Sequence, residues 1–190
     1  MIPQWNSGGV LPPIRPGQLG HSPDRSPYRV PLTAVIEKFA TSPRRTAILR
    51  GLLDYRAALH RCGLVSGFQW LNGSFMEDVE TLESRSPNDM DVVTYFYLPS
   101  GETQLTFATK AGQLLSNSFV KATYSVDAYP HVLGEPNDHL QVRQISYWYS
   151  MWSHRRDGMW KGFIQIDLDP HVDVDAERVL IAIQAEGLAP

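Results

Sequence analysis

The sequence predicts an α/β (α+β) fold in which a small mixed β-sheet is backed by helices. Short apolar or alternating segments of strand length are interleaved with longer segments whose apolar residues recur every three or four positions. Turn-forming Gly, Pro and Asn residues separate these segments. At 190 residues, with 43% hydrophobic and 19% charged residues, the chain has the composition of a soluble globular domain and is long enough to bury a core.

The N-terminal segment has a different composition from the rest of the chain. Residues 1–31 contain seven prolines and four glycines, which disfavours regular structure. We therefore expect an extended arm, either wrapped around the domain or mobile, followed by one domain over residues 32–190. No apolar run approaches the roughly eighteen residues of a membrane span and no signal peptide precedes the arm. A cytoplasmic protein without membrane contact is the expectation.

Two helices are expected after the arm. Leu32–Phe39 places its apolar residues on one side of a short helix. Ser42 is a favourable N-cap and Pro43 a favourable first residue, so a longer helix begins there and runs to about Cys62, where Gly63 ends it. Five arginines on this second helix indicate a solvated face or, alternatively, a face that contacts phosphate or a partner. They are Arg44, Arg45, Arg50, Arg56 and Arg61.

The middle of the chain predicts two strands, a helix and a third strand. Gly67–Leu71 is an apolar strand, and an acidic loop over residues 75–88 leads to the strand Asp89–Tyr97. Gly101–Phe119 has the apolar spacing of a helix. Val120–Tyr129 alternates for most of its length and predicts a half-buried strand with Asp127 near its exit.

The C-terminal part predicts a loop, a hairpin and a final helix. Pro, Gly and Asn residues mark residues 130–137 as a loop. Residues 140–152 contain four aromatic side chains close together, which suit a core, a subunit interface or a surface that stacks a nucleotide base. Asp157-Gly158 predicts a tight turn before the strand Lys161–Leu168, and Ala176–Glu186 predicts a helix.

Two aspartates on one strand are the main functional signal. Side chains alternate across a strand, so Asp89 and Asp91 point to the same face. Two neighbouring carboxylates repel each other unless a cation or protons neutralise them, and a divalent metal ion is the natural companion. Gly73-Ser74 ends the preceding strand and forms a turn beside them. A pair of aspartates that merely caps a strand in an unrelated α/β protein is the alternative, although it leaves this turn unexplained.

Gly73-Ser74 followed by Asp89-x-Asp91 resembles the signature of the nucleotidyltransferase-fold (polymerase-beta-like) superfamily. These enzymes move a nucleoside monophosphate from a nucleoside triphosphate (NTP) onto an acceptor. The chain is more closely similar to a family of small, poorly characterised bacterial proteins that carry this core. Four segments carry this closer resemblance: residues 11–13, 39–45, 72–75 and 156–162.

The resemblance implies a set of site residues. Asp89 and Asp91 would hold Mg²⁺, and Asp127 is the candidate for a third carboxylate, with a surface aspartate before a turn as the alternative. Gly73 and Ser74 would hold the triphosphate. Lys121 is a candidate point charge for the same phosphates, and a solvated lysine is the alternative.

The resemblance also implies a reaction and its partners. The expected activity is nucleotidyl transfer from an NTP to a hydroxyl on RNA, protein or a small molecule, within a toxin-antitoxin or phage-defence system that includes a partner protein. A net charge of -3 argues against a surface built wholly to bind nucleic acid. The alternative function is a catalytically inactive subunit that binds or neutralises a partner. Fourteen residues separate Ser74 from Asp89, more than is usual for the superfamily, and the proline-rich arm suits the gripping of a partner.

Overall fold

A computed structural model describes residues 1–134 and 139–187 of the chain and contains a five-stranded mixed sheet. The strand order is β1-β5-β2-β3-β4. β2 is antiparallel to both β3 and β5, whereas β4 runs parallel to β3 and β1 runs parallel to β5. The predicted α+β fold with a small mixed sheet is confirmed. The strands are β1 Tyr28–Arg29, β2 Gly67–Asn72, β3 Met90–Tyr97, β4 Val126–Leu133 and β5 Ile164–Asp167.

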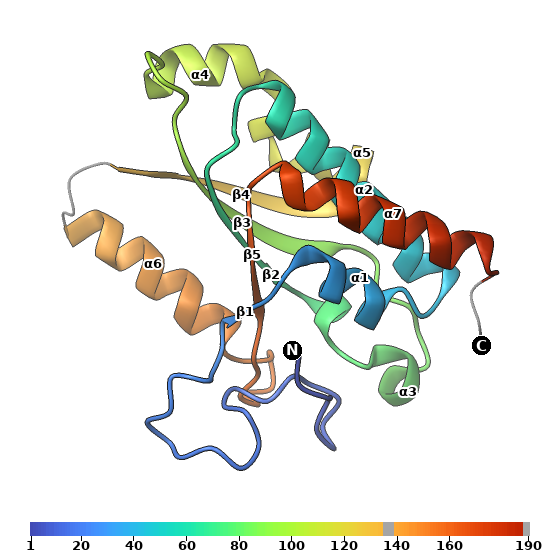
Figure 1. The fold of residues 1–190 in the computed structure, drawn as a ribbon. Helices are drawn as coiled ribbons and strands as arrows, with labels where there is room; N and C mark the ends of the chain where they lie inside the picture. The colour runs from blue at the N-terminus through green and yellow to red at the C-terminus, as the bar shows by residue number, and fades with distance from the viewer. Residues whose placement is uncertain (135–138, 188–190) are drawn as a thin grey trace.

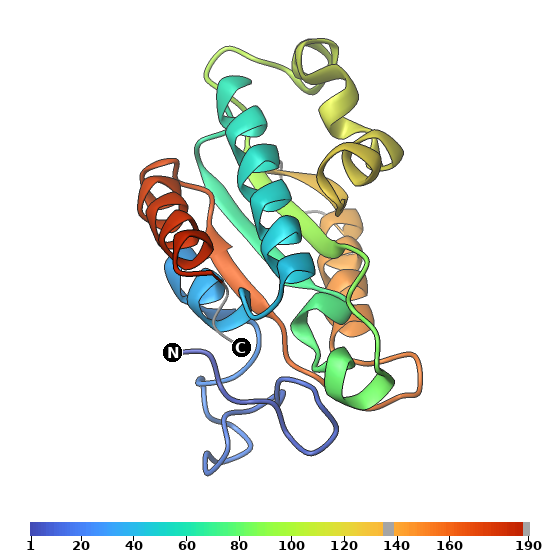
Figure 2. The same ribbon diagram turned by 90° about the vertical axis from the view of Figure 1, so that its right-hand side faces the viewer.

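Helices cover both faces of this sheet. α1, α2 and α7 lie on one face, and α6 lies on the other, as the two views in Figure 1 and Figure 2 show. No helix in the described residues is long and apolar enough to cross a membrane. The α-helices are α1 Leu32–Phe39, α2 Pro43–Arg61, α3 Val79–Glu83, α4 Gln104–Ala111, α5 Asn117–Tyr124, α6 His139–Trp152 and α7 His171–Ala185. Two short 3₁₀ helices are η1 Ser74–Met76 and η2 Gly112–Leu115.

α2 begins and ends where the sequence predicts. The Ser42 hydroxyl accepts a hydrogen bond from the backbone N–H of Arg45, and Pro43 occupies the first turn. The apolar side of α2 is fully buried against the sheet, and this side includes Ile48, Leu52 and Leu59. Burial of this apolar side, rather than intrinsic helix propensity, stabilises α2.

The sheet divides the interior into two apolar clusters. The larger one lies under α1, α2 and α7 and includes Leu71, Val92 and Ile164. The smaller one lies on the α6 side and is largely aromatic. Its buried members are Trp70, Val93, Tyr95, Trp152 and Phe163. Two aromatic residues of α6, Trp148 and Trp152, therefore serve the core, one of the interpretations that the sequence left open, whereas Tyr147 and Tyr149 are exposed.

The N-terminal arm wraps around the domain. Val10 and Leu11 are buried, and Leu11 belongs to the larger core cluster. The indole N–H of Trp5 donates a hydrogen bond to the carbonyl oxygen of Met76 at 2.8 Å. Tyr28–Arg29 adds β1 to the sheet beside β5. Of the two states expected for residues 1–31, the structure shows the wrapped one.

Two predicted elements between β3 and β4 are wrong. The single helix expected over Gly101–Phe119 is interrupted at Gly112, which adopts a positive φ of 51° and separates α4 from η2 and α5. The strand expected over Val120–Tyr129 begins only at Val126, because residues 120–124 continue α5. An alternating segment of this kind also carries apolar residues four positions apart, which suits a helix equally well.

β4 also extends further than predicted. It runs through Pro130 to Leu133, into the segment expected to be a loop. β4 ends the sheet order and pairs with β3 alone among the described strands, so Pro130 needs no second partner for its missing N–H. Residues 135–137 of the predicted loop lie outside the described residues.

Candidate active site

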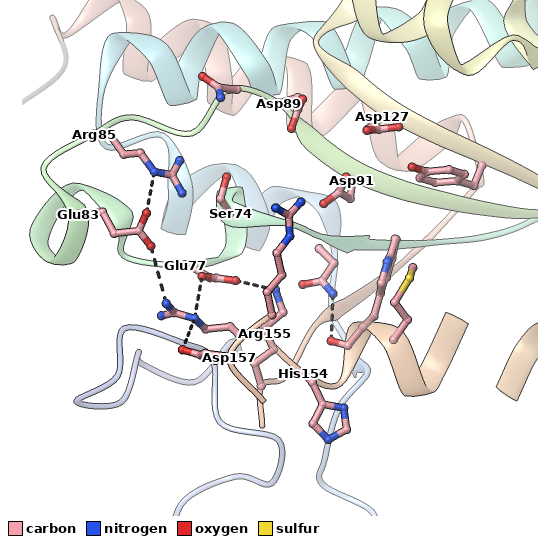
Figure 3. A pocket seen from close by; sticks show the side chains of 18 of the residues that line it. Ser74, Glu77, Glu83, Arg85, Asp89, Asp91, Asp127, His154, Arg155 and Asp157 are labelled. Atoms are coloured by element: carbon pink, nitrogen blue, oxygen red, sulfur yellow. Dashed lines mark hydrogen bonds and ion pairs between the residues drawn. The ribbon is translucent and has the colours of Figure 1, made fainter. Parts of the chain in front are cut away.

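The register of the sheet brings the three predicted aspartates together. Asp91 of β3 is the direct neighbour of Asp127 in the parallel ladder with β4, and it pairs with Asn72 of β2 on its other side. Figure 3 shows Asp89, Asp91 and Asp127 at one end of a pocket. Asp127 is the second residue of β4 and does not lie near the exit of its strand as predicted, because that strand begins late.

The three carboxylates have unequal electrostatic environments. Burial, followed by repulsion from Asp127 and Asp89, raises the pKa of Asp91 to about 6. Burial alone would also raise the pKa of Asp127, but hydrogen bonds from Lys121 and Asn117 outweigh it and lower this pKa. Asp91 is therefore the carboxylate whose negative charge is least compensated.

Lys121 of α5 neutralises the other two carboxylates. Its Nζ lies 2.8 Å from Oδ2 of Asp89 and 2.6 Å from Oδ2 of Asp127. Hydrogen bonds to Asp127 and then to Asp89 raise the pKa of the Lys121 ammonium. Within the described residues, no group of three or more His, Cys, Asp or Glu side chains is placed to hold a metal ion. An ammonium group occupies the position between two of the candidate ligands instead.

The chemistry of these donors nevertheless fits a divalent cation. Carboxylate oxygens are the ligands that Mg²⁺ takes in proteins, and Asp89, Asp91 and Asp127 all line this pocket, with Asp91 and Asp127 as direct neighbours on β3 and β4. Burial and then repulsion from Asp127 and Asp89 disfavour the charged form of Asp91, so a cation bound here would be attracted to all three carboxylates. Movement of the flexible, half-exposed Lys121 side chain would free the oxygens that it now contacts.

The Gly73-Ser74 turn packs directly against this acidic end. Gly73 has a φ of 85°, a conformation that favours glycine. A Cβ at this position would overlap the Asp91 carboxylate, lying 3.0 Å from its Cγ. A larger residue would therefore be strained and would also push Asp91 aside. Ser74 follows as the first residue of η1 and lines the pocket.

The segment after Ser74 is held by a buried arginine. Arg45 is fully buried, and it donates hydrogen bonds of 2.6 Å to the carbonyl oxygens of both Phe75 and Glu77. It also forms a two-point ion pair with Glu80, at 2.7 and 2.8 Å. The prediction of a solvated arginine face on α2 is wrong at this position and at Arg56, which is also fully buried.

The Lys161-Gly162 segment supports the same region from the opposite side. Lys161 is nearly buried, and its Nζ lies 2.6 Å from Oε1 of Glu77. The N–H of Gly162 donates to the carbonyl oxygen of Leu11 in the arm, and a Cβ on Gly162 would lie 2.6 Å from the carbonyl oxygen of Pro12. Segments far apart in the sequence thus meet to fix the loop between β2 and β3.

A pocket of about 770 Å³ lies above these groups. This volume is within the range of small-molecule sites. The aspartates and Lys121 lie at one end. The other end of the pocket holds both basic and acidic side chains. Figure 3 shows these clustered there: Glu77, Glu83, Arg85, Arg155 and Asp157. Ser74 lies between the two ends (Figure 3).

Several ring side chains near the aspartates lie outside the pocket or only border it. His131 packs edge-on against Tyr95, with ring centroids 5.3 Å apart, and burial lowers its pKa. Tyr129 borders the pocket, and the centroid of its ring lies 4.5 Å from the ring centroid of Trp148. Trp152 lines the pocket but is only 5% exposed, which leaves little of its ring for a base.

Two site residues had no sequence signal. Asn117 donates hydrogen bonds to the carboxylate of Asp127 and to the carbonyl oxygen of Ala128. Glu77 joins Lys161 to the loop after Ser74. An isolated asparagine in the first turn of a helix and one acid in an acidic loop resemble ordinary surface residues, so composition alone could not single them out.

Comparison with known proteins identifies the family but no individual relative. No curated protein and no solved structure matches the chain. Residues 3–167 match the sequence model of one family, and this range includes the arm, the Gly73-Ser74 turn and all three aspartates. The chain therefore belongs to DUF6932, a family of unknown function.

Proposed function

We propose that the protein is a metal-dependent nucleotidyltransferase that moves a nucleoside monophosphate from an NTP to a hydroxyl on RNA, protein or a small molecule. One observation carries the proposal. Asp91 and Asp127 are paired neighbours on parallel strands, Asp89 joins them from the same end, and the Gly73-Ser74 turn lies against Asp91. This arrangement borders a pocket large enough for a nucleotide.

The chain supplies charge and position for such a reaction. Asp89, Asp91 and Asp127 would hold Mg²⁺, which when bound neutralises charge on the phosphates and activates the acceptor hydroxyl. Gly73 leaves room for the carboxylate of Asp91 to lie against the turn, and the Ser74 hydroxyl can donate to the phosphates. The buried Arg45 fixes this turn before substrate arrives, so little reorganisation is needed during binding.

Calorimetric titration of each NTP with and without Mg²⁺ tests the proposal. We expect triphosphate binding that requires the metal ion and that disappears in a variant carrying Asp89→Ala and Asp91→Ala. Asp54→Ala is the matched control, because Asp54 is an exposed carboxylate on α2 away from the pocket. Incubation of the intact protein with labelled NTPs and cell extract then reveals whether RNA or protein is modified. Equal binding by the double variant would contradict the assignment.

One observation favours a second candidate, a catalytically inactive subunit that binds or neutralises a partner protein in a toxin-antitoxin or phage-defence system. The ammonium of Lys121 already neutralises Asp89 and Asp127 without a metal ion. In that case the aspartates would stabilise the fold through Lys121. Failure of the intact protein to bind any NTP in the presence of Mg²⁺ or Mn²⁺ would support this second function.

A further inference from the structure

Most basic side chains that line the pocket already have acidic partners. Lys161 is paired with Glu77 at 2.6 Å, and Arg85 is paired with Glu83 at 2.7 Å. Lys121 is held by two aspartates. Arg155 lies 3.4 to 3.8 Å from three different carboxylates, on Glu77, Glu83 and Asp157.

Arg156 is the exception. It lines the pocket and is exposed, and among the contacts of the described residues it makes neither an ion pair nor a hydrogen bond. Its guanidinium therefore offers a full set of donors and an uncompensated positive charge to whatever enters the cavity. Because the other cations of the pocket are already neutralised, an anion that enters the pocket is attracted most strongly to the guanidinium of Arg156.

A well-defined turn presents Arg156. The N–H of Gly158 donates to the carbonyl oxygen of Arg155 at 3.0 Å, which closes a turn with Arg156 inside it. The Asp157 carboxylate accepts a hydrogen bond from the N–H of Met159, and Gly158 has a positive φ of 86°. A bridge between His154 and Trp160 closes the base of the hairpin. The backbone under Arg156 is thus ordered in advance, which lowers the entropy lost on binding.

We infer that Arg156 binds the β- and γ-phosphates of the NTP. This inference rests on the proposed function. The acidic end of the pocket repels a triphosphate except through bound metal, so the phosphates farthest from the reacting centre need a basic contact elsewhere. A guanidinium can contact a phosphate at two points, which also fixes its orientation. Arg156 is thus a substrate-positioning residue on the hairpin that lines the pocket.

Calorimetry with three probes, ATP, AMP and inorganic pyrophosphate, each with Mg²⁺, tests this role. We expect Arg156→Ala to lower the affinity for ATP and for pyrophosphate about tenfold, the size of one exposed charge-assisted contact. The affinity for AMP should stay within about twofold of the wild-type value. Arg156→Lys should restore part of the loss, because it keeps the charge but not the two-point contact. Arg178→Ala is the matched control, an exposed arginine on α7 paired with Asp175.

The outcomes separate this inference from the proposed function. The inference is overturned, and the function left standing, if Arg156→Ala binds ATP and pyrophosphate as tightly as the wild type does. The same holds if its affinity for AMP falls as much as its affinity for ATP. Weaker binding of a short RNA with unchanged ATP binding also overturns it, because Arg156 would then contact an acceptor. If the wild type binds pyrophosphate through Arg156 but binds no nucleotide, the contact stands and the function falls. If the wild type binds none of the probes, both fall.

Discussion

The ammonium nitrogen of Lys121 lies 2.6 Å from Oδ2 of Asp127, and the same nitrogen contacts Asp89 at 2.8 Å. One flexible side chain from α5 thereby joins the carboxylates that precede β3 and begin β4. It stands where a divalent cation would draw on the same oxygens. The charge of Lys121 therefore stabilises the two carboxylates, and it would compete with a metal ion for them.

Replacement of Lys121 should strengthen metal binding. In Lys121→Met we expect Mn²⁺ to bind roughly three- to tenfold more tightly, because no ammonium has to leave the carboxylates. The effect is modest because the Lys121 side chain is half-exposed and its ion pairs are screened by solvent. The melting temperature without metal should fall, because the carboxylates then repel each other uncompensated. Titration calorimetry and thermal melts in EDTA measure the two effects. Lys110→Met, on α4, is the control. Weaker Mn²⁺ binding in Lys121→Met would contradict competition.

The raised pKa of Asp91 predicts a pH-dependent penalty on stability. In the folded protein this pKa is about 6, above the ordinary value of 3.8, so the folded state retains a proton that the unfolded state has lost between these values. Stability from the protonated Asp91 is complete below about pH 3.8 and is lost as the pH rises through about 6.

Asp91→Asn removes this dependence. In EDTA, urea unfolding should show the variant gaining stability relative to the wild type between pH 4.5 and 7.5, by about 2 kcal/mol. Asp54→Asn, at an exposed position on α2, should show no such trend. A constant difference between variant and wild type across this range would mean that Asp91 ionises as freely in the fold as in the unfolded chain.

The parts of the site that the sequence predicts are those encoded locally. The Gly73-Ser74 turn follows from turn chemistry, and the strand that carries Asp91 follows from its apolar pattern, although Asp89 precedes this strand and does not begin it as predicted. The pairing of Asp91 with Asp127 could not be predicted, because register depends on where β4 begins. That start is set by the end of α5 at Ser125, which adopts a left-handed conformation with a φ of 55°.

The burial of Arg45 could not be predicted for a related reason. A helix pattern assigns an arginine to the solvated side unless distant backbone groups need its donors. Here the 3₁₀ turn after Ser74 leaves the carbonyl oxygens of Phe75 and Glu77 pointing inward, and only the fold brings Arg45 to them. The break at Gly112, by contrast, had a signal in the sequence, since an internal glycine lowers helix stability.

Loss of Arg45 should weaken both the fold and the site. Arg45→Met keeps most of the side-chain volume but leaves two buried carbonyl oxygens without donors, so we expect a loss of about 3 kcal/mol in the free energy of unfolding. Chemical denaturation measures this loss. Arg61→Met, at the exposed end of the same helix, should change stability by no more than about 0.5 kcal/mol. Equal stability of the two variants would contradict the supporting role of Arg45.

The contact between Gly51 of α2 and Tyr124 of α5 couples the helices to the site. A Cβ at Gly51 would overlap the carbonyl oxygen of Tyr124 and lie 2.8 Å from its carbonyl carbon, so α5 would have to move. α5 carries Lys121 and leads directly into Asp127. Although alanine ordinarily favours a helix over glycine, Gly51→Ala should therefore lower the free energy of unfolding by about 1–3 kcal/mol.

The same substitution should also disturb metal binding, because movement of the end of α5 shifts the start of β4 and with it the carboxylate of Asp127, a candidate ligand. We expect weaker Mn²⁺ binding in Gly51→Ala, measured by calorimetry below its melting temperature. Gly20→Ala is the control, since a Cβ at Gly20 meets nothing within 4 Å. A destabilised Gly51→Ala variant that binds Mn²⁺ as the wild type does would show that the aspartates keep their positions independently of α5.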